Sequence, residues 1–208
     1  MSRDAILHKV RTALGRNVGA PPPEPPPIPE RRFAAGVESF RACLDKLGGT
    51  TRVTASPEEA RSAVRQILQG RPALAANHPF LTTCGVGGLE NVRKGVDDPG
   101  AWRTACAEVD VGITSADYAL ARTGTLVMIA GPENPRLVSL LPPIHIAVVP
   151  LSRLIGSLDE LLAREPRVFD RSASMVLITG PSRTADIEQI LVRGVHGPGE
   201  LHVVFVAG

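Results

Sequence analysis

The fold of this 208-residue chain is decided by the stretch from residue 144 to residue 179, which contains IHIAVV (144–149), LSRLIGSLDELLA (151–163) and SMVLIT (174–179). The two outer runs are short, almost continuously apolar and rich in β-branched residues, which is typical of strands buried on both faces of a parallel sheet. The middle run has apolar residues at helical spacing. The stretch therefore predicts two parallel strands joined by a helix.

Further segments extend this unit in both directions. TLVMIA (125–130) precedes it and LHVVFV (201–206) follows it, while ADIEQILVRGV (185–195) has helical spacing. The first half of the chain adds two helical patterns and a short strand, at residues 33–47, 57–68 and 50–55. Alternation of this kind predicts an α/β fold with three layers, in which helices cover both faces of a mostly parallel sheet.

The N-terminal part has a different character. Residues 1–16 are predicted to form a short helix with one apolar stripe. Residues 17–31 are predicted to form a proline-rich linker, because PPPEPPPIPE (21–30) favours extended polyproline II. A helix on such a linker either docks loosely on the domain of residues 32–208 or binds another subunit or partner.

Composition excludes several classes of protein. The net charge is +2 and aromatic residues make up 3%, which leaves few platforms on which the bases of a nucleic acid could stack. No stretch reaches the roughly 18 apolar residues of a membrane helix, and the N-terminus lacks a secretory signal, so a cytoplasmic location is expected. The 3 cysteines are too few and too widely spaced for an iron–sulfur cluster or a zinc site. We therefore expect no metal in this chain.

Standard nucleotide and nucleophile motifs do not occur in the sequence. The glycine cluster CGVGGLE (84–90) does not match the G-x-G-x-x-G motif. Counted from Gly85, the sixth position, which should be glycine, is Glu90. There is neither a Walker A sequence nor a G-x-S-x-G elbow, and the 5 histidines are too scattered to define a triad. No catalytic residue can be named from spacing.

A ligand site is expected at the turns that follow the strands, because ligands of open α/β sheets bind beyond the carboxyl ends. After the apolar run SMVLIT (174–179) comes TGPSRTADIE (179–188). Within it, Ser182 or Thr184 can cap a helix whose free N–H groups face an anion. Arg183 would add a fork for a carboxylate or phosphate. A capped helix without any ligand is the more common use of the same residues.

Three other places have candidate residues. GITSADYALARTGT (112–125) resembles a capped helical turn that ends in Thr-Gly-Thr, whose hydroxyls either contact a small ligand or bond their own backbone. His145 lies in an apolar strand, where a hydrogen-bonded core residue is more common than a base. His196 lies in the glycine-rich loop GVHGPG (194–199), from which its ring can face a cleft.

These segments resemble the LUD-domain family, of the lactate-utilisation protein C type. The matching pieces are GITSADYALARTGTLVM (112–128), RLVSLLPPIHIAVV (136–149), TGPSRTADIE (179–188) and GVHGP (194–198), in that order. The resemblance implies a fold similar to that of the sugar-phosphate isomerase and CoA-transferase group. It also implies a role in bacterial oxidation of L-lactate to pyruvate beside separate iron–sulfur subunits, so the clusters are expected on partners and no cofactor in this chain.

The resemblance implies that further polar residues, outside these turns, belong to the ligand site. It also implies an acidic residue at the position where this chain has Arg122. The cleft is expected to bind a small carboxylate or phosphate, or to orient a partner. Two alternatives stay open: a self-sufficient isomerase or acyl-transferase for a phosphorylated or CoA-linked substrate, and a regulatory module without turnover. The expected ligand-binding residues are Asp117, Thr123, Gly124, Thr125, His145, Thr179, Gly180, Ser182, Arg183, Thr184, Asp186 and His196.

Overall fold

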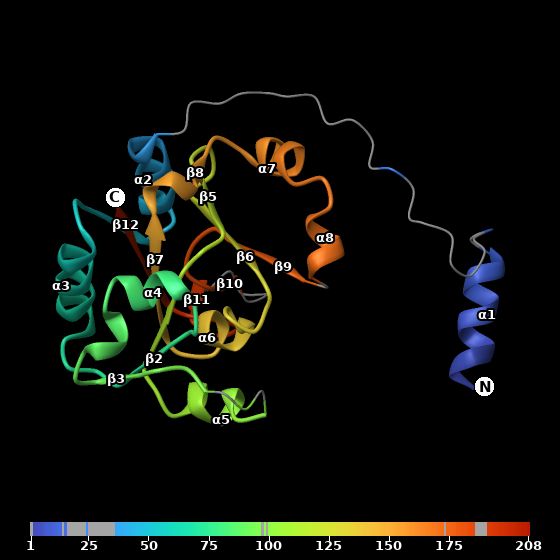
Figure 1. Cartoon of the computed structure of the whole chain (residues 1–208), viewed down its shortest axis with the longest axis horizontal. Coiled ribbons are helices and arrows are strands. Elements are labelled where there is room, and N and C mark those ends of the chain that lie inside the picture. The colour runs from blue at the N-terminus through green and yellow to red at the C-terminus, as the bar shows by residue number, and fades with distance from the viewer. Residues whose placement is uncertain are drawn as a thin grey trace.

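The computed structural model of the chain describes residues 2–13, 15, 24, 36–96, 98, 100–172, 174–185 and 191–208. The predicted N-terminal helix is present as α1 (Arg3–Ala13), none of whose residues is buried (Figure 1). Apart from Glu24, the predicted proline-rich linker lies outside the described residues. The next described element is α2 (Val37–Lys46).

Six strands form the central sheet, in the order β1-β12-β7-β4-β2-β3, and every pairing of neighbours is parallel. Within it, β7 and β12 pair along their full lengths, with Leu201 opposite His145. The predicted α/β class with a mostly parallel sheet is therefore confirmed. The strands are β1 (Thr50–Thr54), β2 (Ala73–Ala75), β3 (Val92–Arg93), β4 (Val111–Thr114), β7 (Ile144–Pro150) and β12 (Glu200–Val206).

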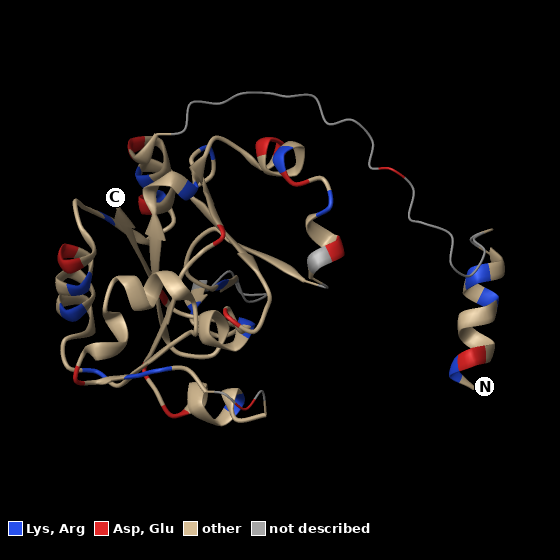
Figure 2. Cartoon of the chain, in the orientation of Figure 1, with Lys and Arg blue, Asp and Glu red and all other residues tan. Residues whose placement is uncertain are grey.

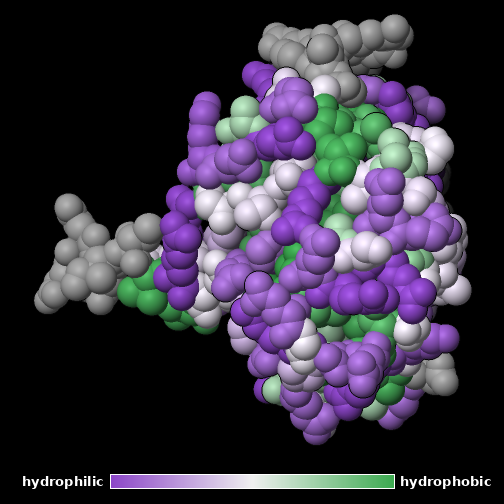
Figure 3. Space-filling model, turned by 90° about the vertical axis from the view of Figure 1, so that its left-hand side faces the viewer, coloured by the Kyte–Doolittle hydropathy of each residue, from purple (hydrophilic) through white to green (hydrophobic). Residues whose placement is uncertain are grey.

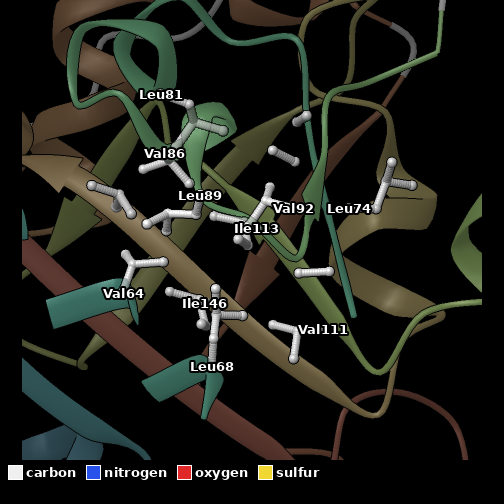
Figure 4. Close-up of a cluster of buried hydrophobic side chains, with 14 of the residues drawn as sticks. Val64, Leu68, Leu74, Leu81, Val86, Leu89, Val92, Val111, Ile113 and Ile146 are labelled. Atoms are coloured by element: carbon white, nitrogen blue, oxygen red, sulfur yellow. The ribbon is translucent and has the colours of Figure 1, made fainter. Parts of the chain in front are cut away.

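Helices cover one face of this sheet. They are α3 (Pro57–Leu68), α4 (Pro79–Thr83) and α5 (Trp102–Ala107). Their apolar side chains join those of the strands in one buried cluster, in which Val64 and Leu68 lie beside Ile146 (Figure 4). Burial of this cluster is the main force that holds the helices on the sheet.

The sequence of α3 shows why its bounds match the prediction. The hydroxyl of Ser56 accepts a hydrogen bond from the N–H of Glu59, and Pro57 occupies the first turn. Acidic residues start the helix and Arg65 lies in its last turn, which suits the helix dipole (Figure 2).

Hydrophilic residues dominate the surface on this side of the molecule, with apolar residues between them (Figure 3).

On the other face lie α2 and a second sheet, of order β8-β5-β6-β9. Its strands are β5 (Tyr118–Leu120), β6 (Thr125–Ile129), β8 (Leu154–Ile155) and β9 (Met175–Ile178). Phe40 of α2 meets Phe205 of β12 edge to face, with ring centroids 5.0 Å apart. The far side of the second sheet packs through Val127 against Leu161 of α7 (Leu158–Arg164).

Shorter elements complete the described part of the chain. The helix α6 (Arg136–Leu140) contacts β4 closely, since a Cβ atom on Gly112 would lie 1.8 Å from the carbonyl oxygen of Val138. The others are η1 (Val86–Gly88), η2 (Leu151–Arg153), α8 (Val168–Arg171), β10 (Arg183–Ala185) and β11 (Leu191–Arg193).

For two of the four apolar runs the predicted sheet is wrong. The runs at 125–130 and 174–179 form β6 and β9, which are antiparallel neighbours in the second sheet. β6 is apolar because it is buried between the central sheet and α7, so its composition matches that of a parallel strand buried on both faces. β9 lies at the edge of the second sheet, and its Leu177 is exposed. A short apolar run does not reveal the direction of its partner.

Three predicted helical segments are also corrected. The helix expected at 185–195 conflicts with the antiparallel pair β10–β11, and residues 186–190 lie outside the described part. The helix expected at 151–163 begins only at Leu158, after η2 and β8. The turn expected in 112–125 contains the strands β4 and β5 instead. In the second and third cases, pairing with a strand remote in sequence overrides local helical spacing. In the first case, the partner strand β11 is a near neighbour in the sequence.

Candidate functional site

A cavity of about 310 Å³ lies between the amino ends of β7 and β12, α6, and the turn after β9. The site was expected beyond the carboxyl ends of the strands, so that expectation holds for the β9 turn and is wrong for the central strands. Its volume suits a small molecule. The chain segments that meet there are far apart in sequence, and several residues of the expected ligand-binding set come together around it. The members of that set that line the cavity are His145, Thr179, Gly180, Ser182, Arg183 and His196.

His145 and Ser139 are buried polar residues of this cavity, and His145 is the one whose ring has an unpaired nitrogen. Its Nε2 lies 2.8 Å from the hydroxyl oxygen of Thr114, whereas Nδ1 is buried without a hydrogen-bond partner among the described residues. Burial, and secondarily the nearby His202, lowers the pKa of His145 to about 3, so the imidazole is neutral near pH 7. Depending on the tautomer, Nδ1 can donate a hydrogen bond to a ligand or accept one from it.

Two loops form one wall of the cavity through backbone hydrogen bonds. The N–H of Ser182 donates to the carbonyl of Pro198 at 2.7 Å, and the N–H of Gly194 donates to the carbonyl of Ser182 at 3.1 Å. The N–H of His196 donates to the Ser182 hydroxyl at 3.4 Å. His196 itself is exposed and also lines a neighbouring groove of about 870 Å³.

Arg183 is committed differently from the expected anion fork. Its Nη2 donates to the carbonyl of Leu47, at the C-terminal end of α2, where a cation is favourable. Arg183 starts strand β10, so no helix begins at Ser182 to direct N–H groups at an anion. Thr184 pairs with Val192 of β11 and does not line the cavity, and Asp186 lies outside the described residues.

The Thr123-Gly124-Thr125 turn adjoins the cavity without lining it. The hydroxyls of Thr123 and Thr125 lie 2.7 Å apart, and that of Thr125 lies 3.0 Å from the hydroxyl of Thr179. Gly124 has φ +65°, and a Cβ atom there would lie 2.7 Å from the backbone nitrogen of Leu44. Glycine at this position therefore allows α2 to pack against the turn.

Arg122, at the position where an acidic residue was expected, also contributes to the packing of α2 against this turn. The backbone carbonyl of Arg122 accepts a hydrogen bond from the Cys43 thiol at 3.4 Å, and its N–H donates to the carbonyl of Gly156 at 3.1 Å. The backbone of Arg122 thus holds this turn between α2 and the loop after β8.

Asp117 lies in a second polar region, at the carboxyl ends of the central strands. Its carboxylate accepts a hydrogen bond from the N–H of Ile129 at 2.7 Å. Burial raises the pKa of Asp117, while this hydrogen bond and the charges of His78 and Arg153 act to lower it. His78 follows β2 and Arg153 follows β7, so neighbouring strands bring them together. The sequence around residues 73–105 had no clear pattern that would have singled out His78.

In the described part of the chain, no three or more His, Cys, Asp or Glu residues are grouped so that they could hold a metal ion. Similarly, none of the described helices is long and apolar enough to cross a membrane.

Comparison with known proteins links the chain to one family. The sequence model of the LUD domain matches residues 37–206. The Lactate utilization protein C of Exiguobacterium sp. is 30% identical over 222 residues, which cover 99% of this chain and 96% of that protein. The Lactate utilization protein C of Halalkalibacterium halodurans is 44% identical over 95 residues, or 44% of this chain and 41% of that protein.

Two other matches carry no information on activity. The uncharacterized protein NMB1437 of Neisseria meningitidis serogroup B is 36% identical over 107 residues, which are 50% of this chain and 46% of that protein. The crystal structure of a DUF162 family protein from Deinococcus radiodurans superposes with a TM-score of 0.60 at 21% identity, and covers 82% of this chain and 96% of that one. This likeness shows a shared fold.

Proposed function

Because the chain belongs to the LUD domain family, we propose that it acts in lactate utilisation, as the subunit without iron–sulfur clusters of a cytoplasmic system that oxidises L-lactate to pyruvate. Oxidation of the hydroxyl to a ketone releases two electrons and two protons. Iron–sulfur subunits bound to this chain would accept the electrons. The support is the resemblance to proteins named Lactate utilization protein C over almost the whole chain.

The cavity beside His145 is the proposed binding site for a small carboxylate. The observation that carries this proposal is the buried Nδ1 of His145, which lacks a partner in a residue that lines a cavity. An unpaired buried polar group is costly, and a hydrogen bond to a ligand removes that cost. Ser182, Thr179 and His196 line the same cavity, and their polar side chains can bond the remaining oxygens.

The first test asks whether the chain assembles with partners. The chain is co-expressed with the iron–sulfur subunits of its own genome, and the complex is purified and assayed for oxidation of L-lactate. We expect stable co-purification and lactate-dependent reduction of the clusters. If all the subunits are folded and do not associate, the proposed subunit role is wrong.

The second test examines the cavity by calorimetry with L-lactate and with pyruvate, on the free chain and on the complex. The His145→Leu variant removes both ring nitrogens, and we expect it to weaken binding about tenfold while the complex stays assembled. Thr184→Ala, outside the cavity, is the matched control and should bind as the wild type does. Turnover of a phosphorylated or CoA-linked substrate by the free chain would instead support the isomerase or acyl-transferase alternative.

A further inference from the structure

We propose that the chain has a second ligand site, a basic pocket that binds the phosphate group of a small phosphorylated molecule. This pocket, of about 390 Å³, lies at the carboxyl end of β2, between α3, the loop Gly85–Gly88 and the residues after β3. It is separate from the His145 cavity and shares no lining residue with it. Its polar lining residues are Arg61, Asn77, Thr82 and Lys94.

Two cations line the pocket without a neutralising partner. Among the described residues, neither Arg61 nor Lys94 forms an ion pair with a carboxylate, and the lining holds no Asp or Glu. Lys and Arg residues colour both α3 and the segment at β3 in Figure 2. Like charges that share a pocket repel each other, so an anion bound between them is stabilised by both.

Arg61 is held in place and still has a free donor. Its Nη2 donates to the carbonyl of Gly88 at 3.0 Å, which fixes the guanidinium against the glycine loop. Its Nε is buried and has no hydrogen-bond partner among the described residues. A ligand oxygen that reached this N–H would remove the cost of leaving it unpaired.

The glycines leave the space that this pocket needs. A Cβ atom on Gly87 would lie 2.9 Å from Cγ of Lys94, and one on Gly88 would lie 3.5 Å from Nη2 of Arg61. Gly85 has φ +63°, a conformation that other residues rarely adopt. The glycine cluster that fails the dinucleotide spacing is therefore explained by the close approach of two cationic side chains to the loop.

The chemistry of the pair favours a phosphate over a simple carboxylate. Arginine presents a planar fork of donors and lysine a compact point charge, and together they match a group with several acceptor oxygens and up to two negative charges. Asn77 and Thr82 add neutral polar groups. The small apolar residues Ala75, Ala76 and Leu81 on the same lining leave room for the organic part of the ligand.

The test uses the fluorescence of Trp102, the single tryptophan in the sequence. Its ring lies behind the pocket, since a Cβ atom on Gly95 would be 2.7 Å from Cη2 of Trp102. The full-length protein is titrated with inorganic phosphate and with glycerol 3-phosphate, at constant ionic strength, and with L-lactate for comparison. Calorimetry on the same samples gives the affinities. We expect saturable binding of the phosphates.

Variants separate this site from general charge effects. Lys94→Gln and Arg61→Gln should each weaken phosphate binding about tenfold. Arg65→Gln, on the same helix but outside the pocket, and His145→Leu should leave it unchanged. Because Arg61 also supports the loop, Lys94→Gln is the decisive variant.

The proposal is overturned if neither phosphate binds saturably, if Lys94→Gln binds phosphate as the wild type does, or if L-lactate binds this pocket more tightly than the phosphates. A phosphate response that persists in His145→Leu supports the second site whether or not the lactate role holds, so the two proposals fail independently.

Discussion

Acidification should destabilise this protein through His145, and the burial of that residue determines the size of the effect. Burial lowers the pKa of His145 from 6.5 to about 3, because the interior disfavours the imidazolium. Between these two values the unfolded chain is protonated at this residue and the folded chain is not. The unfolded state therefore binds more protons, so the free energy of unfolding falls as the pH falls below 6.5 and is retained above it.

The magnitude follows from proton linkage. Each pH unit within the window costs about 1.4 kcal/mol, so acidification from about pH 7 to about pH 5 should remove about 2 kcal/mol through His145 alone. The assay is urea unfolding at a series of pH values, for the wild type and for His145→Gln. The glutamine is uncharged throughout and can still bond Thr114. Burial also lowers the pKa of His78 and His202, but both variants share these residues, so the difference between the curves isolates His145.

The expected result is a stability difference that shrinks by about 2 kcal/mol over that range. Parallel curves would refute the reasoning, because they would mean that the folded protein protonates His145 as readily as the unfolded chain does. The cavity would then hold a cation, and the proposed neutral donor or acceptor at Nδ1 would be wrong. His145→Leu gives a second reference curve, which should have the same pH dependence as His145→Gln.

Other substitutions test the packing. In Gly112→Ala the added methyl carbon would lie 1.8 Å from the backbone carbonyl oxygen of Val138 in α6. This clash should lower the free energy of unfolding by about 2–4 kcal/mol. An unchanged midpoint of chemical unfolding would contradict the contact. Phe40→Ala should cost about 3–5 kcal/mol, while the exposed Phe169→Ala should change stability by about 0.5 kcal/mol or less, and equal losses would refute the assigned core. Burial raises the pKa of Cys84 to about 11, so iodoacetamide at neutral pH should label the partly exposed Cys43 first; mass spectrometry showing equal rates would contradict this order.

Local sequence patterns correctly predict those helices and strands whose conformation depends mainly on their own residues. The cap at Ser56 and Pro57 and the apolar stripe that follows predict α3 with its observed bounds. Apolar runs in the sequence predict the central strands β7 and β12, and these runs are largely buried in the structure. The sequence also indicates the turns after residues 178 and 193 and His145 as candidate ligand positions, and the structure brings these three places to one cavity.

Tertiary structure decided the direction of each pairing and the distance between groups that are remote in sequence. The sequence pattern does not determine whether β6 and β9 run parallel or whether β10 pairs with β11. It also does not determine whether Asp117 reaches the cavity. The unpaired Nδ1 of His145 and the pair of cations at the glycine loop likewise follow from three-dimensional contacts. Local sequence sets conformational preferences worth about 1 kcal/mol per residue, whereas pairing, burial and electrostatics act between groups that only folding brings together.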